Sequence, residues 1–235
     1  MGKKSVQYNQ IIKKDDSKMI KAVIFDLDGT LANTFDDLRS SIDDMRAAFG
    51  MGPISLEQMN SFINASLRGF AEGGLGGERT EEELEKAMKI YVDAYAVHYL
   101  EKTCIYEGLP EVLQKLKEGG AKLAVYSNKM AEYVKKICVK LYGSEIFDIL
   151  MGPDGIIPKP DPMGALIVAK KWGIDPSEIA YVGDSVTDMK TGLAAGMHTI
   201  GVSWGFTARK DLEDAGAHYI VDTRAELFEL LSKLA

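Results

Sequence analysis

The stretch Ile20-Lys21-Ala22-Val23-Ile24-Phe25-Asp26-Leu27-Asp28-Gly29-Thr30 decides the fold. Its apolar run from Ala22 to Phe25 has the length and β-branched content of a buried strand. The run ends on Asp26 and Asp28, and a carboxylate at the end of a buried strand is costly unless a cation or a proton compensates it. Two interpretations fit the segment equally well. One is a phosphoryl-transfer site with Asp26 as nucleophile and Asp28 as proton donor, and the other is an Asp-Gly turn after a strand.

The composition is that of a soluble globular protein. A chain of 235 residues, 46% hydrophobic and 27% charged, suffices for one large domain or for a core with a smaller companion. The net charge of -7 and the lack of a basic patch argue against nucleic acid as a partner. No apolar run is long enough for a membrane span or a signal peptide, so we expect no membrane association and a cytoplasmic location.

Cysteines and histidines give no sign of a metal site. Cys104 and Cys138 lack metal-ligand spacing, and we expect both to be reduced, buried thiols of an intracellular protein. The three histidines are scattered, which argues against zinc. Residues 1–18 are polar and lysine-containing, and we expect them to form a flexible N-terminal extension.

Residues 34–102 predict an inserted, all-helical module. Apolar side chains recur at helical spacing from Leu38 to Phe49, and capping boxes open helices at Ser55 and Thr80. We expect a break at residues 67–70 and a flexible glycine-rich connection at residues 73–77. Arg68, at this break, is the candidate for contact with the non-reacting end of a substrate, and the alternative is a plain surface arginine.

From residue 109 onward strands and helices alternate. Strands are predicted at residues 122–126, 147–150, 179–182, 198–202 and 219–221, with helices between them. This order is typical of an α/β fold with an open parallel sheet, a Rossmann-like core. We assign residues 19–33 and 103–235 to that core and residues 34–102 to the inserted module.

Polar residues collect at the predicted strand ends and in the adjoining loops: Asp26 with Asp28, Ser127 with Asn128, Lys159, and Asp184 with Asp188. Ligands of open parallel sheets bind beyond the carboxyl ends of the strands, so these clusters converge on one rim. Oxygen-only ligands select a hard cation such as Mg²⁺, which Asp26 and Asp184 could hold. The prolines on both sides of Lys159 stiffen its backbone. Lys159 would neutralise phosphate charge, and the Ser127 hydroxyl would donate a hydrogen bond to a phosphate oxygen.

This inventory suits a carboxylate nucleophile. Attack by Asp26 would give an aspartyl-phosphate that water must hydrolyse. Asp28 could protonate the leaving alcohol and then deprotonate the water.

The same residues resemble the motifs of a known family. Its four motifs are matched by Asp26-Leu27-Asp28-Gly29-Thr30-Leu31, Ser127-Asn128, Lys159-Pro160 and Gly183-Asp184-Ser185-x-x-Asp188. The set resembles the haloacid dehalogenase-like (HAD) superfamily, and Ser127-Asn128-Lys129 with Lys159-Pro160-Asp161-Pro162 resembles its phosphoglycolate phosphatase-like branch. The likeness covers about residues 19 to 235.

The resemblance implies a Rossmann-like core with a helical cap inserted after the first motif. It implies Asp26 as nucleophile, Asp28 as acid and base, and Ser127 and Lys159 as phosphoryl-binding residues. Mg²⁺ would be held by Asp26, Asp184 and the backbone carbonyl of Asp28.

The remaining site residues are assigned supporting roles. We expect Asn128, Gly29 and Thr30 to contact the substrate together with Arg68, while Asp188 and Ser185 support the metal and Lys159. Lys129 is either a surface charge at the start of a helix, the interpretation we prefer, or a second cation near the phosphate. The tyrosines at 91, 95 and 99 are expected in the core of the cap.

The predicted function is a Mg²⁺-dependent phosphatase for a small, phosphoglycolate-like phosphate monoester. One alternative is a phosphomutase of the β-phosphoglucomutase type, which shares the core residues. Another is a non-catalytic binding or regulatory protein, against which the complete acidic set speaks. The second Asp of the first motif argues against dehalogenation.

Overall fold

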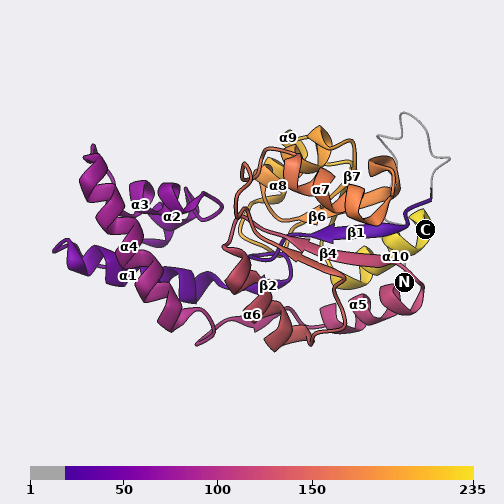
Figure 1. Ribbon diagram of the computed structural model, residues 1–235, viewed down its shortest axis with the longest axis horizontal. Helices are drawn as coiled ribbons and strands as arrows, with labels where there is room; N and C mark the ends of the chain where they lie inside the picture. The colour runs from indigo at the N-terminus through magenta and orange to yellow at the C-terminus, as the bar shows by residue number, and fades with distance from the viewer. Residues whose placement is uncertain (1–18) are drawn as a thin grey trace, which may run out of the picture.

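The computed structural model describes residues 19–235 (Figure 1), and the expectation for residues 1–18 lies outside them. The core is a six-stranded sheet in the order β5-β4-β1-β6-β7-β8, and all its neighbouring strands are parallel. Its strands are β1 (Ala22–Phe25), β4 (Lys122–Tyr126), β5 (Ile149–Met151), β6 (Ile179–Gly183), β7 (His198–Val202) and β8 (Tyr219–Val221). The α/β class predicted for the core is confirmed.

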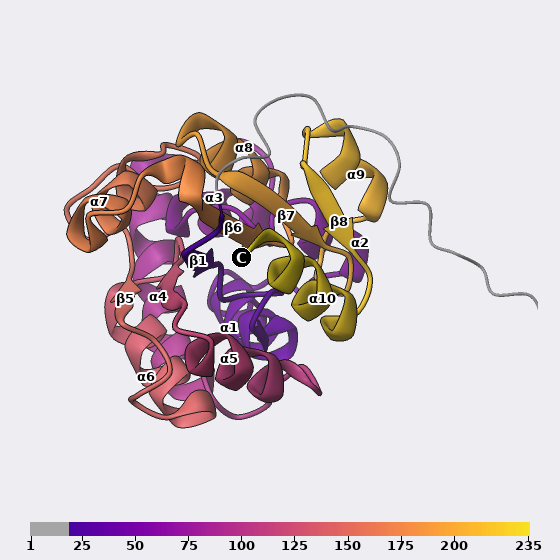
Figure 2. The ribbon, with the colours of Figure 1, turned by 90° about the vertical axis from the view of Figure 1, so that its right-hand side faces the viewer.

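Strand β1 is apolar throughout because helices cover both faces of the sheet. Val23 and Phe25 belong to one buried cluster, and Ala22 and Ile24 belong to another. Figure 2 shows α7, α8 and α9 on one side of the sheet, with α5, α6 and α10 on the other. These helices are α5 (Leu109–Glu118), α6 (Ala131–Tyr142), α7 (Met163–Trp172), α8 (Val186–Ala194), α9 (Arg209–Asp214) and α10 (Arg224–Leu234), with a 3₁₀ turn at Pro176–Glu178.

A group of helices, which we call the insertion, lies between β1 and β4 in sequence. In space it lies beyond one end of the strands, at the left of Figure 1. It consists of α1 (Phe35–Ala48), α2 (Leu56–Asn60), α3 (Leu67–Leu75) and α4 (Glu81–His98). The chain leaves and returns through a two-stranded antiparallel sheet of β2 (Ala32–Asn33) and β3 (Cys104–Ile105). These strands were not predicted from the sequence, because two residues are too few for a detectable period.

The expected break at residues 67–70 and the flexible link at residues 73–77 are wrong. Helix α3 covers most of this stretch, and Ser66 caps its N-terminus. Its glycines serve close packing: a Cβ atom on Gly73 would lie 2.3 Å from the Phe62 ring, and one on Gly74 would lie 2.4 Å from Met45. Tertiary contacts therefore override the low helix propensity of glycine here.

The two cysteines differ in environment. Cys138 is buried in α6, as expected, but Cys104 is exposed in the short strand β3, whose two residues are both exposed. Within residues 19–235, no helix is both long and apolar enough to cross a membrane.

Asp37 ties the two connections of the insertion together. Its carboxylate, in the first turn of α1, is buried and accepts hydrogen bonds from the backbone N–H groups of Lys102 (2.9 Å) and Thr103 (2.8 Å). The start of the insertion is thus fixed to its end by charge-assisted hydrogen bonds.

We expect Asp37→Ala to loosen this junction and destabilise the protein. Losing hydrogen bonds to a charged acceptor and leaving buried N–H groups unpaired should lower the free energy of unfolding by about 3 kcal/mol. That corresponds to a fall in Tm of roughly 6–12 °C for a chain of this size, measured by circular dichroism. The matched control is Asp36→Ala, because Asp36 is the exposed neighbour in the same helical turn. Equal Tm values for the two variants would contradict the role of Asp37.

Candidate active site

Three strand ends place the polar residues at one edge of the sheet. Asp26 follows β1, Ser127 follows β4, and Asp184 follows β6. The register pairs Phe25 with Val125 and with Val182, so the residues that follow these strands are neighbours. Parallel pairing alone therefore brings a carboxylate, a hydroxyl and a second carboxylate together.

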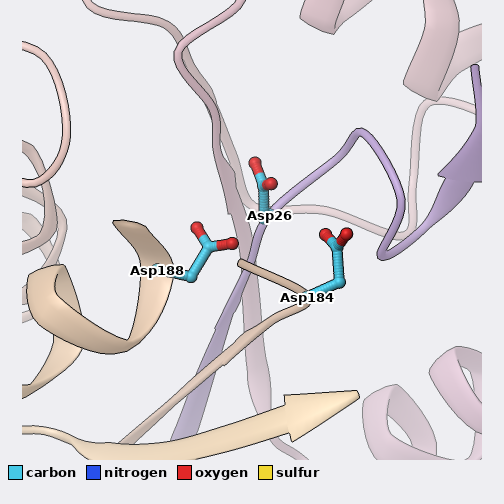
Figure 3. Close-up of side chains that lie close together, drawn as sticks. All are labelled: Asp26, Asp184 and Asp188. Atoms are coloured by element: carbon cyan, nitrogen blue, oxygen red, sulfur yellow. The ribbon is translucent and has the colours of Figure 1, made fainter. Parts of the chain in front are cut away.

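The carboxylates of Asp26, Asp184 and Asp188 form one buried cluster. Each offers an oxygen within 4.8 Å of the oxygens of the other two. Figure 3 shows the three carboxyl groups directed toward a common space, two from strand ends and Asp188 from the first turn of α8. Asp28, expected beside them, lies outside this cluster.

Burial makes the charges of this cluster costly. Burial, followed by the charge of Asp188, raises the pKa of Asp26 to about 7, although Lys159 acts in the opposite direction. Burial, followed by the charges of Asp188 and Asp26, raises the pKa of Asp184 well above its usual value. A cation among the three carboxylates would relieve both effects.

Lys159 supplies part of the compensation. Its Nζ lies 2.7 Å from Asp26 Oδ1 and 2.7 Å from Asp188 Oδ1. Burial acts to lower the pKa of Lys159, but the charges of Asp188 and Asp26 raise it well above its usual value. Asn128 fixes the backbone here, because its Oδ1 accepts from Lys159 N–H at 2.8 Å and its Nδ2 donates to Lys159 O at 3.1 Å.

Asp26 still has bonding capacity. The buried Oδ1 of Asp26 pairs with Lys159 by distance but accepts no well-aligned hydrogen bond from residues 19–235. The ion pair with Lys159 stabilises this oxygen all the same, since an ion pair needs proximity rather than alignment. An under-bonded carboxylate beside two others fits a hard, oxygen-binding cation.

Asp184 is held in place by its neighbours. Its Oδ1 accepts from Thr30 Oγ1 at 2.9 Å, and its Oδ2 accepts from the Phe206 backbone N–H at 2.8 Å. Gly29 (φ 79°) and Gly205 approach so closely that a Cβ atom on either would lie within 2.4 Å of Asp184. Gly29 and Thr30, which are predicted to contact substrate, thus both lie against the Asp184 carboxylate.

The loop carrying Gly205 and Phe206 was not assigned to the site from the sequence. The signal available was a glycine shortly after a predicted strand, which is too common to be informative.

Ser185 and Asp188 form a capping box at the start of α8. Ser185 Oγ donates to Asp188 Oδ2 at 2.5 Å, and the Asp188 backbone N–H donates to Ser185 Oγ at 3.1 Å. This interaction orients Asp188 toward Lys159, in keeping with the supporting role expected of both residues.

Asp28 lies on the side of the site nearest the insertion. Its Oδ1 accepts from Thr34 Oγ1 at 2.6 Å and from the ammonium of Lys129. The expectation that Lys129 is a surface charge is wrong, since its side chain is only 6% exposed. It also donates to Tyr95 Oη at 2.6 Å, so helix α4 covers it.

A cavity between the insertion and the core contains these groups. Its polar lining includes Asp26, Asp28, Ser127, Asn128, Lys129, Lys159 and Asn64. Its apolar and aromatic lining comes largely from the insertion and includes Leu38, Ile63, Leu67, Phe70, Tyr91 and Tyr95. Two of the three tyrosines expected in the interior of the insertion therefore also line the cavity.

The structure does not bring Arg68 to this cavity. The guanidinium is exposed on α3 and pairs with Glu81 and Glu72, each at 2.8 Å. Those two carboxylates, rather than a substrate, satisfy it in this arrangement.

Comparison with known proteins places this site in a family. The model of the haloacid dehalogenase-like hydrolases matches residues 23–202, a range that includes all four motifs. The chain belongs to the haloacid dehalogenase-like hydrolase family. The family assignment made from the motifs is thereby confirmed.

Several relatives of this hydrolase are phosphatases by name. N-acetylmuramic acid 6-phosphate phosphatase of Pseudomonas aeruginosa is 31% identical, covering 91% of this chain and 96% of the relative. Phosphoglycolate phosphatase of Nitrosospira multiformis is 32% identical, with coverages of 91% and 96%. The crystal structure of a predicted phosphoglycolate phosphatase from Haemophilus somnus superposes with a TM-score of 0.83 at 25% identity, covering 90% and 97%. The enzyme class predicted from the sequence, a phosphatase for small phosphate monoesters, is confirmed.

We expect Mg²⁺ to stabilise this hydrolase through the buried carboxylates. At saturating Mg²⁺, about 100 times its Kd, the free energy of unfolding should rise by about 2.7 kcal/mol. The rise in Tm should be roughly 5–10 °C at pH 8 and smaller at pH 5.5. Because the raised pKa of Asp26 is about 7, a proton competes with the cation below that pH.

Differential scanning fluorimetry with Mg²⁺ or EDTA measures the effect. Asp184→Asn should abolish the shift in Tm, whereas Asp211→Asn, on the exposed face of α9, should keep it. An unchanged shift in the Asp184 variant would refute this metal site.

Proposed function

We propose that the protein is a Mg²⁺-dependent phosphatase that works through an aspartyl-phosphate on Asp26. The observation that carries the proposal is the buried Asp26 carboxylate at the cavity, held 2.7 Å from Lys159 Nζ and short of hydrogen-bond donors. A carboxylate in this state is a positioned nucleophile. Lys159 keeps it in place and places positive charge beside the incoming phosphoryl group.

Asp26, Asp184 and the backbone carbonyl of Asp28 would hold the ion, with Asp188 nearby. When bound, Mg²⁺ would neutralise charge on the phosphoryl oxygens and keep the Asp26 carboxylate ionised. The Ser127 hydroxyl and the side chain of Asn128 line the same cavity and would bind the phosphoryl oxygens.

Two proton transfers at Asp28 complete the reaction. Asp26 attacks phosphorus, the bond from phosphorus to the ester oxygen breaks, and Asp28 gives its proton to that oxygen. Asp28 then takes a proton from water, which attacks the aspartyl-phosphate and releases inorganic phosphate. Because Thr34 and Lys129 both bind Oδ1, the proton would be carried on Oδ2 of Asp28.

The cavity favours a small ester. It lies between the core and the insertion, so the insertion would cover the substrate and keep bulk water from the reacting group. Phosphoglycolate is the first substrate to test, because several relatives are named for it. We propose residues 34–102 as the cap and residues 19–33 with 103–235 as the catalytic core, in a cytoplasmic protein.

The mutase alternative fits the cavity less well. A sugar bisphosphate would need cations for two phosphoryl groups, yet Lys129 and Lys159 are the only cationic side chains among the described residues that line the cavity. Lys159 is already committed to two carboxylates. The complete acidic set likewise speaks against an idle binding protein.

Asp26→Asn should abolish turnover of p-nitrophenyl phosphate, with a loss of at least about 10³-fold in kcat, because a neutral amide cannot attack phosphorus at a useful rate. Release of p-nitrophenol measures it. The control is Asp211→Asn on α9, which should match the wild type. EDTA should abolish the turnover of p-nitrophenyl phosphate by the wild type, and added Mg²⁺ should restore it. Activity of the Asp26 variant near that of the wild type would exclude the aspartyl-phosphate.

A further inference from the structure

Lys129 has a donor that the described residues do not use. A lysine ammonium has three N–H groups. One binds Asp28 Oδ1 and one binds Tyr95 Oη, and within residues 19–235 the ammonium has no other partner. Lys129 lines the cavity, so its third N–H is available to a ligand there.

The hydroxyl of Tyr95 has a spare donor as well. Because Tyr95 Oη accepts from Lys129, its own hydrogen remains to be donated, and the phenol of a tyrosine keeps this hydrogen at neutral pH. No acceptor for it occurs in the described part of the chain. Tyr95 also lines the cavity.

The two donors lie side by side. The distance between Lys129 Nζ and Tyr95 Oη is 2.6 Å, a spacing that suits the two oxygens of one carboxylate. A cation and a neutral O–H acting together bind a carboxylate more strongly than a neutral hydroxyl, because hydrogen bonds to a charged acceptor are shorter and stronger.

The surroundings strengthen this preference. The insertion lines the cavity next to Tyr95 with apolar and aromatic groups such as Ile63, Phe70 and Tyr91. Charge-assisted hydrogen bonds are stronger in such a low-dielectric setting than in water. Lys159, the other cation of the cavity, already faces Asp26 and Asp188.

We propose that Lys129 and Tyr95 together bind a carboxylate on the leaving alcohol of the substrate. The proposal rests on the proposed phosphatase function and adds the residues that select the ester. Since Lys129 belongs to the core and Tyr95 to the insertion, such a carboxylate would also hold the insertion against the core.

The test compares esters that differ in one group: 2-phosphoglycolate, with a carboxylate, and ethyl phosphate, with a methyl group in its place. For the wild type we expect kcat/KM to favour phosphoglycolate by about 100-fold or more, the value of a charge-assisted hydrogen bond. Lys129→Met should lower this ratio by about 100-fold, and Tyr95→Phe by up to about tenfold.

The readout is the ratio of the two kcat/KM values. A merely structural effect, or an effect through Asp28, would slow both esters alike and leave the ratio unchanged, which would overturn the proposal. Lys136→Met is the matched control, because Lys136 is an exposed lysine of α6, and its ratio should equal that of the wild type.

Wild-type measurements test the proposal even if a variant fails to fold. Equal rates for phosphoglycolate and ethyl phosphate would overturn it while leaving the phosphatase intact. Preference for 2-hydroxyethyl phosphate or ethylene glycol bisphosphate over phosphoglycolate would overturn the carboxylate assignment. Failure to hydrolyse any ester, p-nitrophenyl phosphate included, would instead contradict the proposed function.

Discussion

The ion pair of Lys159 with Asp26 and Asp188 is the interaction on which the site depends. Buried carboxylates repel one another, and their charges are costly at this depth unless a cation, a proton or hydrogen bonds compensate them. Lys159 offsets two of the charges, while Thr30 and the backbone of Phe206 bind Asp184. Compensation is incomplete, since burial and neighbouring charge still raise the pKa of Asp26. A divalent cation held among the three carboxylates would lower this residual cost.

The insertion and the core meet at contacts that reach this charged cluster. Phe206 binds Asp184 through its backbone, and its ring packs edge-on against Phe35 at 5.8 Å between centroids. Its neighbour Thr207 accepts a hydrogen bond from Asn64 at 3.1 Å. A shift of the insertion would therefore displace Phe206 and change its hydrogen bond to Asp184. The fold thus links the position of the insertion to the geometry of the carboxylates.

Local signals were sufficient for most of the core. The strand at residues 22–25 has only apolar side chains because both of its faces are buried, and this pattern is visible in the sequence. The capping boxes at Ser55 and Thr80 are likewise local and lie where expected. Helix α3 was not predicted because its glycines suggest a loop. In the structure these glycines pack closely against Phe62 and Met45, where a larger residue would not fit. Those contacts join residues distant in the chain, which no local pattern records.

The sequence by itself determined the order of the strands and helices of the six-stranded parallel sheet, and the meeting of Asp26, Ser127 and Asp184 at one edge. It could do so because strand direction and strand ends follow from periodicity and turn residues. Only the tertiary structure decided which cations face the cavity. Arg68 and Lys129 are equally polar in sequence, yet Arg68 is satisfied by Glu81 and Glu72, and Lys129 is buried under Tyr95. Burial and pairing of a charge depend on how the insertion packs on the core. That packing leaves no periodic pattern in the sequence from which it could be predicted.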